Sequence, residues 1–139
     1  MSTTTLASPF EHPTVSHTLP RAEQSAATAR RLTRAALAQW GLGELADDVA
    51  LVVSELVTNA VQHTTCASIR VRLTRLDQRR VQVAVVDKSH TPPMRRTPTD
   101  SEDSGRGLTL VEAVTTRWGT DPLPWGKRVW ADLELTSGT

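Results

Sequence analysis

The sequence is poor in the residues that build cross-linked, membrane-embedded or strongly charged proteins. Cys66 is the one cysteine among 139 residues, which excludes an internal disulfide and fits a reducing compartment. No apolar run approaches the roughly 20 residues of a membrane-spanning helix, and the N-terminus lacks the basic start and apolar stretch of a signal peptide. The formal net charge of +1 gives no strong field toward nucleic acid or a membrane. We therefore expect one cytoplasmic domain with neither as a partner.

The first half of the chain predicts a weak strand and two helices. Residues 1–13 are rich in Ser, Thr and Pro and are expected to be disordered. Residues 14–19 alternate in the manner of an edge strand. Residues 22–40 have the Ala, Leu and Arg content of a helix that stops at glycines, and 47–63 carry a valine- and leucine-rich stripe with acidic residues at the start.

The second half predicts a hairpin, a long loop, a helix and a final strand. Alternating residues 68–76 and 81–87 form the hairpin around the turn 77–80. A Pro-rich segment without apolar periodicity follows, and the helix GRGLTLVEAVTTRW comes after it. The last strand lies within 128–135.

Helices grouped with antiparallel strands indicate an α+β protein. We expect a two-layer sandwich with a mixed, mostly antiparallel sheet covered on one face by about three helices. The domain is predicted to span 14–135, followed by the tail 136–139.

Three polar side chains occur at regular spacing in the helix predicted over 47–63. Glu55, Asn59 and His63 follow one another at i, i+4 and i+8, so they share one side of the cylinder. Glu55 and Asn59 border the apolar stripe. A carboxylate there suits a general base and an amide oxygen suits a hard cation, whereas His63 has a plain explanation as a favourable group at a helix C-terminus. A self-satisfied polar patch is the alternative.

Two further features are each weak evidence for a binding site when taken alone. The glycines of GRGL, residues 105–108, stand directly before a helix, where backbone N–H groups bind phosphate or merely form a turn. Asp87 ends a strand of valines, as a turn residue or as an acceptor for an amino group.

In combination, these features resemble the GHKL ATPase superfamily of gyrase, histidine kinases and their relatives. The N-box is ELVTNAVQH, the first glycine-box position is VVDKS, the lid is 88–104 and the second glycine box is SGRGLTLV. The short chain and its ending GKRVW are similar to the anti-sigma-factor serine kinases and the stand-alone ATP-binding regulators of actinobacteria.

The resemblance implies a role for each matching residue. Asn59 contacts the Mg²⁺ that bridges the phosphates of ATP, and Glu55 is the base that activates a serine or threonine hydroxyl of a protein substrate. Asp87 accepts a hydrogen bond from the adenine amino group. The phosphates are cradled by the second glycine box, namely Gly105, Arg106, Gly107 and Leu108. Residues 88–104 close over the nucleotide.

Two readings of the function remain open. Retention of Glu55 favours a kinase that phosphorylates an anti-sigma-factor antagonist, or a regulator that sequesters a sigma factor. Ser89 and Thr91 stand where glycines are expected, and Arg128 stands where the superfamily often has Thr; the lost glycines favour a non-catalytic or nucleotide-free interaction module. A homodimer is a further expectation, with Trp125 and Trp130 as candidate contact residues.

Overall fold

Two α-helices and five strands make up the part of the chain that the computed structural model describes, residues 12–63, 67–88 and 114–135. The helices are α1 (Gln24–Gln39) and α2 (Ala46–His63), joined through a short 3₁₀ turn, η1 (Gly43–Leu45). The strands are β1 (Thr14–Pro20), β2 (Ser68–Asp77), β3 (Arg80–Asp87), β4 (Arg117–Leu123) and β5 (Gly126–Glu134). The predicted edge strand, both helices of the first half and the hairpin are therefore confirmed.

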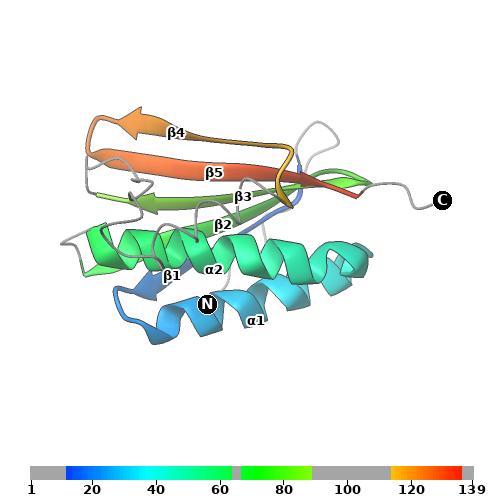
Figure 1. The fold of residues 1–139 in the computed structure, drawn as a ribbon, viewed down its shortest axis with the longest axis horizontal. Coiled ribbons are helices and arrows are strands. Elements are labelled where there is room, and N and C mark those ends of the chain that lie inside the picture. The colour runs from blue at the N-terminus through cyan, green and yellow to red at the C-terminus, as the bar shows by residue number, and fades with distance from the viewer. Residues whose placement is uncertain (1–11, 64–66, 89–113, 136–139) are drawn as a thin grey trace, which may run out of the picture.

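The strands form one open sheet in the order β1-β2-β3-β5-β4, and each of these pairings is antiparallel. Both helices lie on the same face of this sheet (Figure 1). The α+β two-layer sandwich is confirmed, and the described sheet is antiparallel rather than mixed. A third helix, expected from Gly105, falls outside the described residues up to 113.

The alternation of each strand divides the sheet into an apolar inner face and a polar outer face. Inward-pointing residues of the three central strands pair across the sheet, as in the row Val71, Val85 and Val129, and α2 packs on these strands. Leu37 and Leu56 complete the core from the helices. Each such buried side chain stabilises the fold by about 1.5–3 kcal/mol.

Helix α1 ends where the sequence places a glycine. Gly41 has a φ of +73°, a left-handed conformation that costs glycine no steric strain. The N–H of Leu42 donates to the carbonyl of Leu37 at 2.8 Å, and the N–H of Gly41 donates to that of Ala38 at 3.2 Å. These two bonds form a Schellman motif, which turns the chain toward α2.

The predicted turn between β2 and β3 is also present. The Asp77 carboxylate accepts bonds from the Arg79 backbone N–H and from Arg80 Nε, both at 2.8 Å. These two bonds hold the pKa of Asp77 below its usual value, with the backbone bond as the larger cause. Turn chemistry of the kind that Asp provides thus fixes the register of the hairpin.

Strand β4 was not predicted, and it corrects the expected helix over 105–118. Val114 is helical, but the strand begins at Arg117. Its sequence does not look like a strand because it contains Gly119 and Pro122, and both residue types are depleted in strands. Proline is tolerated here because β4 pairs only with β5 and forms an edge of the sheet. Gly119 fits because a Cβ at this position would lie 3.0 Å from the Trp130 ring.

Candidate nucleotide-binding site

The polar residues of α2 lie at the border between its buried and exposed sides, as their spacing predicts. Glu55, Asn59 and His63 are all half-buried, whereas Val52 and Leu56 beside them are buried. Helix α1 packs on another side of α2, where Arg30 Nη1 donates to Ser54 Oγ at 2.8 Å. The carboxylate and the amide therefore occupy a half-buried flank of α2, beside its buried stripe.

Glu55 sits in an environment that favours its protonated form. Partial burial raises the pKa of this carboxyl above its usual 4.5, and the positive charge of Arg30 opposes that rise. A carboxylate with a raised pKa is a better proton acceptor for a hydroxyl group than an ordinary one. The environment of Glu55 is thus compatible with general base chemistry.

Asp87 is paired with a lysine. It is the last residue of β3, and Lys127 of β5 is its direct cross-strand neighbour. Lys127 Nζ donates to both carboxylate oxygens, at 2.9 Å to Oδ2 and 3.1 Å to Oδ1. The side chain of Asp87 is 0% exposed and that of Lys127 is 3% exposed. Both point to the helix-covered face, because Val85 and Val129, two residues away in each strand, lie in the core.

The backbone beside this ion pair is tightly packed. A Cβ on Gly126 would lie 2.0 Å from the carbonyl oxygen of Asp87 and 2.7 Å from the Cα of Lys88. Glycine is therefore required at 126, and the start of β5 has no room to shift. Lys127 is held against Asp87 by the sheet itself.

Arg128 lies on the opposite face of the sheet. Its guanidinium donates to Asp121 Oδ2 at 2.8 Å and to Gln82 Oε1 at 2.6 Å. The residue that stands in place of the superfamily's threonine therefore points away from Asp87. The neighbour that faces Asp87 is Lys127, which the sequence did not single out.

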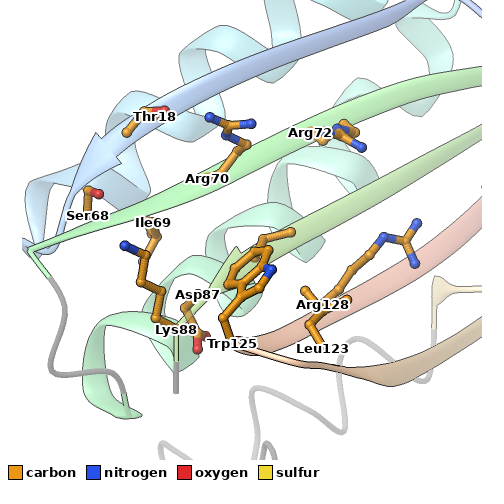
Figure 2. Close-up of a pocket in the computed structure, with 11 residues that line it drawn as sticks. Thr18, Ser68, Ile69, Arg70, Arg72, Asp87, Lys88, Leu123, Trp125 and Arg128 are labelled. Atoms are coloured by element: carbon orange, nitrogen blue, oxygen red, sulfur yellow. The ribbon is translucent and has the colours of Figure 1, made fainter. Parts of the chain in front are cut away.

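A hollow of about 560 Å³ opens on the outer face of the sheet at the same end. Figure 2 shows Arg70 and Arg72 projecting from β2 into it and the Trp125 ring lying between Lys88 and Arg128. Of the two candidate contact residues for a homodimer, Trp125 is 54% exposed and Trp130 is half-buried. Asp87 is among the residues that line this hollow, whereas Glu55 and Asn59 are not. The hollow is therefore a basic surface feature that includes only one of these three predicted site residues.

The remaining predicted site residues lie outside the described residues. These are the second glycine box, Gly105, Arg106, Gly107 and Leu108, and the lid 88–104 apart from Lys88. The structure therefore describes the α2 pair and Asp87. It leaves the phosphate-cradling segment as a prediction.

The described residues fit Mg²⁺ only as a partner of phosphate. Among them, no group of three or more His, Cys, Asp or Glu side chains is arranged to hold a metal ion. Magnesium keeps several waters and takes one or two protein oxygens together with substrate phosphates. The amide oxygen of Asn59 suits that role, and Asn59 lies one helical turn from Glu55.

Comparison with known proteins decides the family. A family model described as a histidine kinase-like ATPase domain matches residues 19–130, which is most of the chain. The chain belongs to this family. The resemblance to the GHKL superfamily of ATP-binding proteins is thereby confirmed, and the open antiparallel sheet with helices on one face is the fold expected for it.

The histidine kinase-like fold is also found among solved structures, six chains of which match. One is the histidine kinase domain of a blue-light activated histidine kinase from Erythrobacter litoralis EL346, with 24% identity and a TM-score of 0.50. The alignment covers 85% of this chain and 62% of that chain; at this identity it supports the fold alone. No curated protein matches. No helix in the described ranges is long and apolar enough to cross a membrane.

Proposed function

We propose that this histidine kinase-like ATPase domain binds Mg·ATP between the flank of α2 and the end of β3. The observation that carries the proposal is the half-buried pair Glu55 and Asn59, one turn apart on α2. Half-buried polar groups beside an apolar core are costly unless they have partners, and a metal with phosphates supplies them. Asp87, at the end of β3 on the same face of the sheet, supplies an acceptor for the adenine amino group.

The reaction proposed for this site is phosphoryl transfer to a serine or threonine hydroxyl. Glu55 takes the proton of the hydroxyl as its oxygen attacks the γ-phosphorus, and the bond from phosphorus to the bridging oxygen of ADP breaks. Magnesium, when bound, offsets the negative charge of the phosphates. Phosphoryl transfer asks the protein mainly for positioning and charge stabilisation, which Asn59 and the second glycine box would provide.

The proposed partners are an anti-sigma-factor antagonist as the phosphorylated protein and a sigma factor as the sequestered one. This part rests on the order of the motifs and on their likeness to short actinobacterial regulators. It also agrees with a single family domain over residues 19–130. A homodimer is proposed on the same basis, and sedimentation at two protein concentrations distinguishes it from a monomer.

A second function is favoured by the ion pair. Because the Asp87 carboxylate is closed to water and bound to Lys127, a base reaches it only after a local rearrangement at this end of the sheet. A chain that has lost nucleotide binding would keep this pair as a structural element. It would then act as a protein-interaction module without ATP.

A phosphotransfer assay separates the two functions. The full-length chain is incubated with γ-³²P-ATP, Mg²⁺ and each candidate antagonist of the source organism. We expect label on one antagonist with the wild type and none with Glu55→Gln, although Glu55→Gln still binds ATP. Nucleotide binding without transfer to any antagonist would favour the regulator that only sequesters its partner.

A further inference from the structure

Three cations on the outer face of the sheet have no partner among the described residues. Arg70 and Arg72 on β2 and Lys88 directly after β3 are exposed, and their charged groups form no hydrogen bond or ion pair with the described part of the chain. Farther along the same face, by contrast, Arg117 is bound to Asp132. The unpaired positive charges at this end of the face attract an anion.

The same cations line the hollow that also has apolar residues in its lining. Its volume of about 560 Å³ lies within the range of about 300–1,000 Å³ that is usual for ligand sites. The apolar residues include the half-buried Val86 and Leu123 and the exposed Trp125, whose ring is seen in Figure 2. Asp87 also lines the hollow, but its side chain is 0% exposed, so its carboxylate is closed to a ligand that enters from solvent. The hollow therefore offers both positive charge and apolar surface to one ligand.

The spacing of the cations matches an extended peptide. Arg70 and Arg72 stand two residues apart on β2, so their Cα atoms lie about 6.6 Å apart, which is the spacing of alternate side chains in an extended chain. Across the sheet, Arg70 is in register with Val86, and Val86 with Arg128. Arg128 is already bound to Asp121 and bounds the hollow on that side. A segment with carboxylates at alternate positions can therefore pair with Arg70 and Arg72 at once, through two parallel N–H···O bonds each.

A nucleic acid fits the same face less well. Proteins that bind single-stranded nucleic acid stack successive bases on several aromatic side chains. Of the described tryptophans on this face, Trp125 is exposed, whereas Trp130 is half-buried with the guanidinium of Arg117 over its ring, 5.5 Å from the centroid. The exposed Asp121 and Glu134 lie on the same face and repel a longer polyanion. The charges therefore favour a short acidic segment of a protein.

We propose that this hollow binds an extended acidic segment of a partner protein. Carboxylates at alternate positions of the segment pair with Arg70 and Arg72, a further carboxylate pairs with Lys88, and an apolar side chain packs on Trp125. The hollow lies opposite the face of the sheet that α1 and α2 cover (Figure 1). Binding of the segment therefore does not depend on the proposed nucleotide site.

The test measures peptide binding to the full-length chain by fluorescence anisotropy at low ionic strength. The probe is a fluorescein-labelled peptide in which glutamate alternates with threonine and which ends in leucine; the control peptide has glutamine in place of each glutamate. We expect the glutamate peptide to bind about tenfold more tightly or better, because hydrogen bonds between two charged groups are the stronger kind. Added salt is expected to reduce this preference.

Two double variants separate the hollow from the net charge of the chain. Arg70→Gln with Arg72→Gln is expected to weaken binding of the glutamate peptide by about tenfold or more. The matched control is Arg31→Gln with Arg34→Gln, at exposed positions of α1 in the other layer. It changes the net charge equally, and glutamine is about as good a helix former as arginine. We expect it to change the affinity by less than about twofold.

Single variants test the other contacts of the segment. Trp125→Ala is expected to weaken binding by about threefold to tenfold, and Trp125→Phe by less, because it keeps an aromatic ring. Circular dichroism shows whether each variant is folded. If the double variant on β2 does not fold, Lys88→Gln, which lies outside the strands, takes its place with an expected loss of about threefold.

Four results would overturn the proposal. Equal weakening by the two double variants does so, since general charge then explains the effect. Equal binding of the two peptides does so as well, as does a wild type that binds neither peptide at millimolar concentration. The fourth is a short single-stranded oligo-dT that binds more tightly than the glutamate peptide and is lost in Arg70→Gln with Arg72→Gln, which would assign the hollow to nucleic acid. Titration with Mg·ATP tests the proposed function separately, because this double variant is expected to bind ATP as the wild type does.

Discussion

The substitution Lys127→Met tests how much the buried ion pair contributes to the fold. It removes the ammonium group that lies beside the carboxylate of Asp87, which is 0% exposed. Removing one partner of a buried pair costs about 3–5 kcal/mol, against a total stability of about 5–15 kcal/mol for a single domain. With a urea dependence of about 2 kcal/mol per M, the unfolding midpoint falls by about 2 M.

A double variant separates the pair from the packing of its members. Lys127→Met with Asp87→Leu removes both charges of this pair, and such replacements are often neutral or stabilising. We therefore expect the double variant to be more stable than Lys127→Met alone when followed by circular dichroism in urea. The exposed pair of Arg34 and Asp47 gives the control, because Arg34→Met costs about 1 kcal/mol or less. A cost below about 1 kcal/mol for Lys127→Met, or a double variant that loses the sum of both single costs, would refute the reasoning.

Three further predictions concern single side chains. Gly126→Ala puts a Cβ 2.0 Å from a backbone oxygen and lowers the unfolding free energy by about 1–3 kcal/mol or more. Its control is Gly43→Ala, which has open space around it and changes the unfolding free energy by less than about 0.5 kcal/mol. Equal urea midpoints for the two variants would contradict this prediction. Thr33 Oγ1 is buried with no hydrogen-bond partner in the described chain. Thr33→Val therefore raises the unfolding free energy by about 1 kcal/mol in the same assay. A lower unfolding free energy for this variant would count against the prediction. Because the pKa of Glu55 is raised, the folded state binds protons more tightly and wild-type stability falls as pH rises from 4.5 through the folded value. Glu55→Gln is then more stable than the wild type at pH 7, and this advantage shrinks on acidification; an advantage that grows on acidification contradicts the sign.

The fold was largely predictable because its elements follow simple periodicities. The valines of 81–87 alternate and become a central strand, and Gly41 stops α1 through a φ of +73° that few other residues adopt. Strand β4 was not predicted because Gly119 and Pro122 interrupt the alternation of apolar and polar residues. What makes this segment a strand is its pairing with β5 across the turn at 124–125, which the pattern of its own residues does not signal.

The site was predictable in part for a related reason. Spacing along one helix places Glu55 and Asn59 on one flank, since that relation is local. The partnership of Asp87 with Lys127 spans 40 positions and depends on the register between β3 and β5. Alternation in both strands could have indicated it, because Lys127 shares the inward parity of Val129, yet a lysine there reads as solvent-exposed.

The central claim is that this chain binds Mg·ATP on the flank of α2, and calorimetric titration of the full-length protein with ATP tests it most directly. The wild type and Asn59→Ala are titrated with and without Mg²⁺, and Glu55→Ala serves as the variant that keeps the metal contact. We predict saturable binding by the wild type and by Glu55→Ala, with Asn59→Ala weakened only when Mg²⁺ is present. Absence of binding by the folded wild type at millimolar ATP or ADP would contradict the account.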